Sequence, residues 1–194
     1  MTLSQCDWAV FVNPGHWSRY SLQLVDMVAH MARGRADLAN TALRIFLQEM
    51  GEAYDEQRGR TPYRGDKDFQ EVKTFFEDKC CYCGVEFSAT VPAVQDHLIP
   101  MNKTKLGLHA WGNVVPACHE CNAKKQGKDW REFIIQRAGA DADRRHSRIK
   151  AFVETYAYSP TLDLRGVAAE LYDEVGAIAM SLITAKVKRI KVQL

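Results

Sequence analysis

Two pairs of cysteines with the same internal spacing constrain this chain more than any other feature. Two residues separate Cys80 from Cys83 and Cys118 from Cys121, and thirty-four residues lie between the pairs. Four thiolates at this spacing can supply the tetrahedral shell of a structural Zn²⁺. The gap is longer than the roughly 15 to 20 residues of a simple zinc ribbon, so we expect a sizeable structured segment between the pairs.

Other side chains near the pairs give alternatives to this ligand set. Cys81 is next to Cys80, but only Cys80 keeps the two-residue spacing, and Gly84 accepts the positive φ that such a turn often adopts. We interpret Cys81 and Cys6 as small buried side chains. His119 lies inside the second pair, where we expect it to be exposed or beside a ligand, because four thiolates complete the shell. Chance clustering of free thiols is the alternative for the whole arrangement.

The enclosed segment carries residue types that phosphodiester hydrolysis requires, namely a base that activates water and ligands for a cation. His97 is a suitable base because an imidazole is largely neutral at pH 7. Asp96 and the side-chain oxygen of Asn122 are hard ligands suited to Mg²⁺. Lys125 follows Asn122 by one helical turn, which places it to contact a phosphate, and Lys124 is a second candidate for this role.

Asp96 and His97 raise a geometric difficulty. Short β-prone stretches predict strands at about 93–96 and 113–117. Neighbouring residues on a regular strand point to opposite faces, so both side chains reach one site only if the strand is irregular. We therefore predict a bulge or a strand end at His97.

Four motifs in a fixed order give this segment a family resemblance. The chain reads CCYCG at 80–84, DHLIP at 96–100, GNVVPAC at 112–118 and CHECNAKK at 118–125. The segment at about 79–130 resembles the HNH nucleases, the ββα-metal group, in their zinc-knuckle version. The resemblance implies His97 as general base, Asp96 and Asn122 as ligands of the catalytic metal, and a structural zinc on the four cysteines. It also implies that Asn113 braces the loop and orients His97.

One motif position departs from the histidine that names the family, because this chain has Asn122 there. An amide oxygen is a harder ligand than imidazole, which favours Mg²⁺ or Mn²⁺ over Zn²⁺ or Ni²⁺. Asparagine is familiar at this position in the family, so we do not interpret it as inactivating. The resemblance thus implies metal-dependent cleavage of DNA that leaves 5′-phosphate and 3′-hydroxyl ends.

Helices are predicted before the first cysteine pair. Apolar residues at near-helical spacing predict amphipathic helices at 21–32 and 35–50, and an apolar run at 8–12 allows a short strand. Asp68 and Glu71 resemble a capping box, which predicts a helix that ends at the first cysteine pair.

Helices are also predicted after the second cysteine pair. The pattern predicts a short helix after Cys118, another from Trp130 and a longer one at 141–156. A last helix at 164–190 has an apolar seam that either packs on the N-terminal helices or forms a homodimer or a contact with a partner protein. The basic end of the chain finishes this helix or forms a small strand. The seam residues are Val167, Leu171, Val175, Ile178 and Leu182.

Several residues outside the motifs are candidates for nucleic-acid contacts, with solvated surface as the alternative. His109 is placed to contact a phosphate, and Trp111 either stacks on a base or packs under the loop. A surface linker at 57–66 contributes three arginines. They are Arg58, Arg60 and Arg64.

Composition narrows the class of protein. The 194 residues are 46% hydrophobic and 26% charged, which excludes a mainly disordered chain and allows a substantial core. No apolar run is long enough to cross a membrane, and the first residues lack a signal-peptide pattern, so a cytoplasmic location is expected. The formal charge of +2 falls to about zero once four thiolates bind Zn²⁺. Attraction for nucleic acid must then be local.

Together these observations predict an α+β protein with a central zinc-stapled ββα-metal unit at 79–138. Helical regions at 1–78 and 139–194 flank it and fold with it as one body. The expected function is hydrolysis of DNA, with RNA the less favoured substrate, in a restriction or phage-defence setting. It uses structural Zn²⁺ and catalytic Mg²⁺ or Mn²⁺. The alternatives are a non-catalytic zinc module that binds nucleic acid and a latent nuclease subunit of a larger complex.

Overall fold

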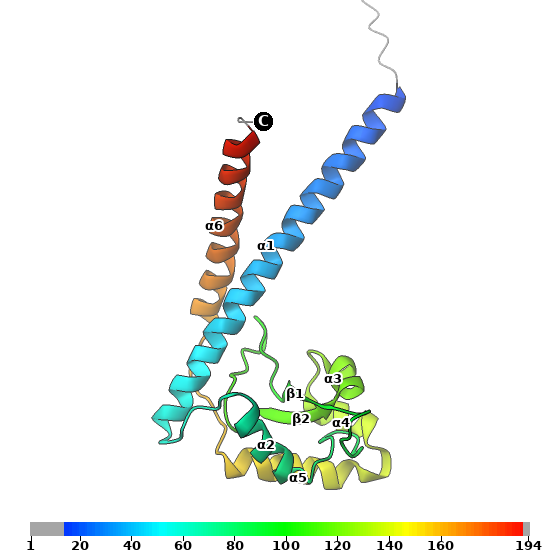
Figure 1. The fold of residues 1–194 in the computed structure, drawn as a ribbon, viewed down its shortest axis with the longest axis vertical. Coiled ribbons are helices and arrows are strands. Elements are labelled where there is room, and N and C mark those ends of the chain that lie inside the picture. Colours follow the sequence, from blue (N-terminus) through cyan, green and yellow to red (C-terminus); the bar gives the residue numbers. More distant parts are fainter. Residues whose placement is uncertain (1–13, 192–194) are drawn as a thin grey trace, which may run out of the picture.

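A computed structural model describes the backbone of residues 14–191 and the side chains of residues 32–191. Within this range it contains helices and a two-stranded sheet (Figure 1), so the protein has the predicted α+β class. The strands are β1 (Ala93–His97) and β2 (Val114–Cys118). The helices are α1 (Pro14–Gln57), α2 (Gly65–Phe75), α3 (His119–Lys125), α4 (Trp130–Arg137), the 3₁₀ helix η1 (Gly139–Asp141), α5 (Ala142–Thr155) and α6 (Arg165–Lys191).

The two strands and the helix that follows them form the central unit. β1 and β2 pair antiparallel in a regular register, from Ala93 opposite Cys118 to His97 opposite Val114. Every residue of β2 is buried, because α2 packs on the sheet and α3 contacts both strands. The Cys118 sulfur caps α3 by accepting from the backbone N–H of Cys121 at 3.4 Å. The predicted strands and the predicted helix after Cys118 are confirmed.

A hydrophobic core joins the central unit to helices on both sides. α2 contributes Phe69 and Val72, β2 contributes Val114 and Val115, and α5 contributes Phe152, all of them buried. Burial of such large apolar side chains contributes about 1.5–3 kcal/mol each. The three predicted regions of the chain thus share one interior.

A second hydrophobic cluster lies under the long loop between the strands, residues 98–113. Here the C-terminal half of α1 packs against the loop and against the start of α6. From this point α1 and α6 extend away from the central unit, in contact with each other near it and diverging toward their far ends (Figure 1). The buried members are Leu43, Leu47, Tyr54, Leu108, Ala110, Tyr158 and Ala168.

The N-terminal helices differ from the prediction. One continuous helix, α1, replaces the two helices predicted at 21–32 and 35–50. Gly34 lies between them, but a single glycine costs a helix only about 1 kcal/mol, and no proline interrupts the chain there. α2 begins at Gly65 rather than after Asp68, and the Asp68 carboxylate instead accepts from the backbone N–H of Arg64 at 2.5 Å. The strand predicted at 8–12 lies outside the described residues.

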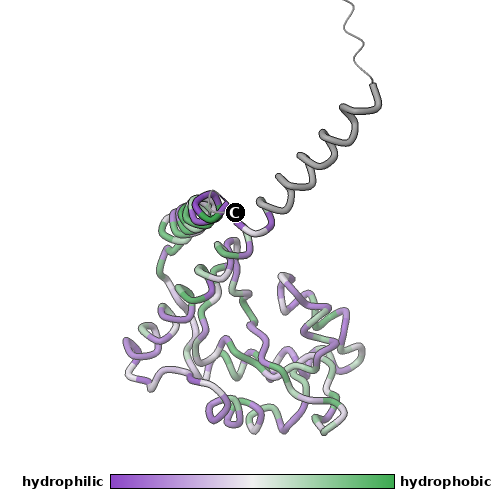
Figure 2. Tube along the Cα trace, turned by 45° about the horizontal axis from the view of Figure 1, so that its top comes forward, coloured by the Kyte–Doolittle hydropathy of each residue, from purple (hydrophilic) through white to green (hydrophobic). Residues whose placement is uncertain are grey.

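The last helix packs on α1 of the same chain, as one of the two interpretations predicted, and continues to Lys191 without forming a strand. The predicted seam is only partly correct. Leu171 and Val175 are half-buried, but Val167 is exposed and the fully covered positions are Ala168 and Gly176. Small residues let the two helices approach closely. Association with a second chain stays a prediction. Exposed apolar residues continue along α6, and Figure 2 shows hydrophobic positions along this helix. They include Ile178, Leu182, Ile183, Val187 and Ile190.

Among the helices described, none combines the length and apolar character that a membrane crossing needs.

The close approach at Gly176 predicts how the helix pair responds to substitution. A Cβ at Gly176 would lie 2.8 Å from Cγ of Arg35 in α1, so Gly176→Leu overpacks the contact. We expect a loss of about 1–3 kcal/mol in the free energy of unfolding, measured by urea denaturation. Gly166→Ala is the matched control because no atom lies within 4 Å of its added Cβ. Equal stability of Gly176→Leu and the parent would contradict the observed packing.

Candidate active site

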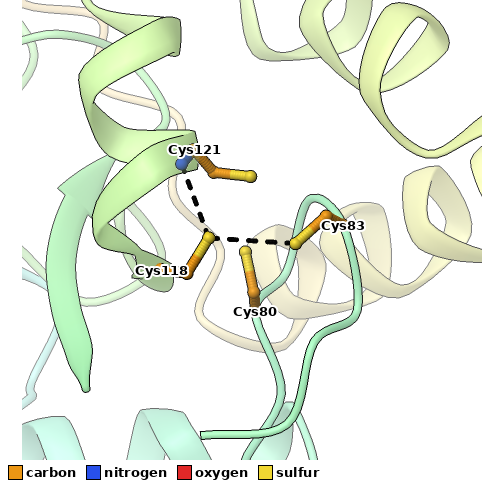
Figure 3. A group of neighbouring side chains, drawn as sticks. All are labelled: Cys80, Cys83, Cys118 and Cys121. Atoms are coloured by element: carbon orange, nitrogen blue, oxygen red, sulfur yellow. Dashed lines mark hydrogen bonds between the residues drawn. The ribbon is translucent and has the colours of Figure 1, made fainter. Parts of the chain in front are cut away.

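The four predicted zinc ligands meet at one point. Their sulfur atoms all lie within 4.8 Å of one another, and the sulfurs of Cys83 and Cys118 are 3.8 Å apart (Figure 3). A tetrahedral zinc with Zn–S bonds of about 2.3 Å requires S···S distances of about 3.8 Å. The residues therefore fit a structural Zn²⁺. The first pair lies on a loop and the second spans the start of α3, so the metal would join distant parts of the chain.

Local backbone geometry supports this ligand set. Gly84 adopts a φ of +77°, as predicted for the end of the first turn, and its N–H donates to the Cys80 carbonyl at 2.9 Å. A hydrogen bond from the Cys121 thiol lowers the pKa of Cys80, which favours the thiolate that binds metal. Cys81 is buried, and its N–H donates to the Pro116 carbonyl in β2. The interpretation of Cys81 as a buried side chain is confirmed, whereas Cys6 lies outside the described residues.

Arginines surround the cysteine cluster. Arg137 of α4 donates through Nε to the Cys121 sulfur at 3.2 Å and through Nη2 to Glu120 at 2.6 Å. Arg145 of α5 donates to the Cys80 carbonyl at 3.3 Å. Hydrogen bonds of this kind orient metal ligands and stabilise thiolate charge. His119 is exposed, in agreement with one of the two positions expected for it.

Asp96 is held from two sides by buried polar groups. The Tyr82 hydroxyl donates to Oδ2 at 2.5 Å, and the Lys125 ammonium lies 3.2 Å from the same oxygen. Burial raises the pKa of Asp96, although Lys125 and Tyr82 both counteract this effect. Tyr82 belongs to the first cysteine pair and Lys125 to α3. The carboxylate therefore takes its orientation from the zinc cluster and from the helix.

Lys125 does not lie where the sequence predicted. Its side chain is fully buried, and besides Asp96 it donates to the backbone carbonyl of His97 at 2.6 Å. An ammonium enclosed in this way has no access to a phosphate in solvent, so the predicted phosphate contact is wrong for Lys125. Its observed role is to join α3 to the end of β1.

His97 points to the other side of β1. The pairing of β1 with β2 is regular through His97, so no bulge forms there, although His97 does end the strand. Its Nε2 lies 2.9 Å from Nδ1 of His109, a half-buried residue of the loop between the strands. Burial lowers the pKa of His97 well below its usual value, and the nearby charges of His109 and Lys125 act in the same direction. The ring is therefore neutral at pH 7, as a base requires.

Asn113 braces the chain immediately after His97. Its side-chain oxygen accepts from the N–H of Ile99 at 2.8 Å, and its amide donates to the carbonyls of Ile99 at 3.1 Å and Leu108 at 2.7 Å. Its backbone carbonyl accepts from the N–H of Leu98 at 2.9 Å. One buried side chain thus ties both ends of the loop together.

Asn122 lies in α3, one turn before Lys125. Its side chain is half-buried, and its amide forms no hydrogen bond with any residue that the structure describes. α3 packs against β1, the strand that carries Asp96. The amide oxygen is therefore free to bind a ligand.

The remaining candidates for nucleic-acid contacts fall into two groups. Lys124 is exposed and pairs with Glu120 of the same helix. Arg64 is exposed and pairs with Glu52 of α1. Arg60 is half-buried and donates to the Thr155 carbonyl at 3.0 Å. His109 contacts His97 instead of standing free for a phosphate. Trp111 is buried and stacks on Tyr156, so it packs under the loop.

The predicted nucleic-acid contact of Arg58 is also corrected by the structure. It donates to the buried carboxylate of Asp55 and to the carbonyls of Tyr156 and Trp111. Asp55 in turn accepts from the N–H of Trp111 at 3.3 Å and that of Tyr63 at 3.0 Å. This buried pair fastens the end of α1 to the loop, so Arg58 has a structural role and no free guanidinium for phosphate. Sequence reasoning missed Tyr82 and Asp55, although the position of Tyr82 between two ligands was a usable signal.

Removal of one zinc ligand should abolish cooperative folding. Cys118→Ala leaves three thiolates, and we expect it to lose both bound zinc and the cooperative melting transition, because structural zinc supplies folding free energy. Zinc content by mass spectrometry and melting by circular dichroism measure this. Cys81→Ala is the matched control, expected to keep zinc at a cost of about 1 kcal/mol. A Cys118→Ala variant that melts like the parent would contradict the structural role.

The two neighbouring lysines of α3 give a second test. Lys125→Met leaves the Asp96 carboxylate buried without its ion-pair partner, so we expect a loss of about 3–5 kcal/mol in urea denaturation. Lys124→Met removes only an exposed pair and should leave stability nearly unchanged. A Lys125→Met variant that is stable but binds DNA more weakly would instead support the predicted contact between Lys125 and a phosphate.

Comparison with known proteins agrees with this geometry. Residues 80–128 match a family model described as HNH endonuclease. No curated protein and no solved structure matches the chain significantly. The matched segment contains the four cysteines, both strands and α3. The match supports a nuclease function, because HNH nucleases act on nucleic acids. Residues 80–128 therefore match an HNH endonuclease domain, with a cysteine cluster consistent with the zinc-knuckle version of that domain.

Proposed function

We propose that this protein is a metal-dependent HNH endonuclease that hydrolyses phosphodiester bonds of DNA. The observation that carries the proposal is the placement of a carboxylate, a neutral imidazole and a braced loop at one strand end inside the matched segment. Asp96, His97 and Asn113 supply these features. Hydrolysis of a phosphodiester needs a base for the attacking water and stabilisation of the charge that develops on oxygen.

His97 acts as the base in this proposal. Its Nε2 is engaged by His109, which leaves Nδ1 to accept a proton from water. Asp96 and His97 point to opposite faces of β1, but His97 ends the strand, so a phosphate lying across this end can be reached from both faces. Asn113 keeps the following segment, and with it the ring, in place.

Asp96 and Asn122 would hold the catalytic cation. Both offer hard oxygens, which suits Mg²⁺ or Mn²⁺. Oδ2 of Asp96 is taken by Tyr82 and Lys125, whereas Oδ1 has only a 3.5 Å contact with Lys125 and keeps capacity for a metal. The amide of Asn122 is unbonded within the described part of the chain. When bound, the cation would stabilise the negative charge on the leaving oxygen.

Exposed basic residues would contact the DNA backbone. Lys124 lies on α3 beside the proposed metal ligand, and its present partner Glu120 is also exposed, so a phosphate can replace it. Arg60 and Arg64 would extend the contact along the linker between α1 and α2. In this proposal the protein acts in restriction or phage defence, and it associates with a second copy or a partner protein through the helix at 164–190.

Plasmid nicking tests the function. We expect the protein with zinc to nick supercoiled plasmid in Mg²⁺ or Mn²⁺, and His97→Ala to reduce the rate by at least about 100-fold while zinc content and melting stay unchanged. His119→Ala, which alters an exposed histidine, is the matched control. Binding of plasmid without cleavage in either ion would favour the non-catalytic zinc module. Repeating the assay with the products of neighbouring genes separates that outcome from a latent subunit.

A further inference from the structure

The contact between His97 and His109 joins the proposed base to a residue of the loop. Nε2 of His97 and Nδ1 of His109 are 2.9 Å apart, with ring centroids 5.2 Å apart. A neutral imidazole has one protonated nitrogen, so in this pair one ring donates and the other accepts. If His97 donates through Nε2, its Nδ1 keeps the lone pair that a base needs. If His109 donates instead, Nδ1 of His97 carries the proton and cannot accept another.

His109 is itself held by α1, which lies outside the matched segment. Its backbone N–H donates to the carbonyl of Leu47 at 3.4 Å. Gly51 is buried against the His109 backbone so closely that a Cβ at this position would overlap the His109 carbonyl. The edge of the ring packs on Tyr63, with centroids 5.0 Å apart at 81°. The backbone and the ring of His109 are thus both held by residues that precede the first cysteine pair.

The rest of the loop is fixed on the same side. The N–H of Leu108 donates to the hydroxyl of Tyr158 at 3.0 Å, and its carbonyl accepts from Asn113. The N–H of Trp111 donates to Asp55 in α1. Because Leu108 and Trp111 are anchored on either side of it and its ring packs on Tyr63, His109 has little freedom to leave His97.

We infer that His109 is a positioning residue for His97, and that α1 sets its position through the contact at Gly51. This inference rests on the proposed function, in which His97 is the base. His109 accepts the Nε2 proton of His97, which holds the ring in one orientation and leaves Nδ1 free toward the attacking water. Misplacement of a catalytic group by about 1 Å can reduce a rate by about 100-fold.

Single-turnover cleavage of plasmid in Mn²⁺, combined with the ring ¹⁵N spectrum of His97, tests this role. His109→Ala should reduce the cleavage rate by roughly 10-fold to 100-fold, with unchanged zinc content and unchanged affinity for plasmid in Ca²⁺. The spectrum should change from one tautomer with a proton on Nε2 to a mixture. His109→Gln, whose amide oxygen can accept the same proton, should restore part of the rate. A loss of stability alone would not produce this pattern.

A second pair of variants tests the part played by α1. Gly51→Ala forces the His109 backbone to move, so we expect the same change in rate and spectrum as for His109→Ala. Gly34→Ala is the control in the same helix, because no atom lies within 4 Å of its added Cβ, and it should behave as the parent. A folded Gly51→Ala variant with the rate and spectrum of the parent overturns the part assigned to α1, and if Gly51→Ala does not fold, the His109 variants still decide the positioning role.

The possible failures are distinguishable. A parent protein that cuts DNA, together with a folded His109→Ala variant that cuts equally fast and keeps one tautomer of His97, overturns the positioning role alone. A parent protein that cuts no DNA under any of these conditions overturns the proposed function, and the positioning role with it.

Discussion

The meeting of two cysteine pairs from distant parts of the chain is the constraint on which the rest of the site depends. Cys118 ends β2 and Cys121 lies in the first turn of α3, while Cys80 and Cys83 belong to a loop before the sheet. Bringing the sulfurs together fixes the start of α3 against that loop. Tyr82, inside the first pair, is thereby placed against the Asp96 carboxylate. The orientation of the proposed metal ligand thus follows from the contacts that close the fold.

The buried ion pair of Lys125 and Asp96 connects α3 to the end of β1. Desolvation of two charges can cancel most of their attraction, so replacing such a pair by apolar residues is often neutral. Here the ammonium also donates to the His97 carbonyl, which ties α3 to the strand end that carries both proposed functional groups. An apolar pair would pack, but it would supply neither the carboxylate nor the hydrogen bond to the His97 carbonyl.

Sequence patterns predicted that the four cysteines meet, and they failed where orientation depends on distant partners. The spacing of the cysteines, the positive φ of Gly84 and the two strands are local properties, and all were predicted. The burial of Lys125 depends on Asp96, which comes 29 residues earlier in the chain, and no local pattern encodes that contact. The expectation of a bulge or a strand end at His97 came from the assumption that both side chains reach one site, and the strand does end at His97. The regular register places them on opposite faces of the strand end instead.

The contacts of His109 show that the site is not confined to the segment that matches the HNH model. The loop between the strands lies within residues 80–128, yet Leu47 and Gly51 of α1 determine where that loop runs. α1 packs in turn on α6 close to the central unit (Figure 1). Gly51 thus lies one contact away from the loop and two from the proposed base, which connects the helix pair to the candidate site through packed residues.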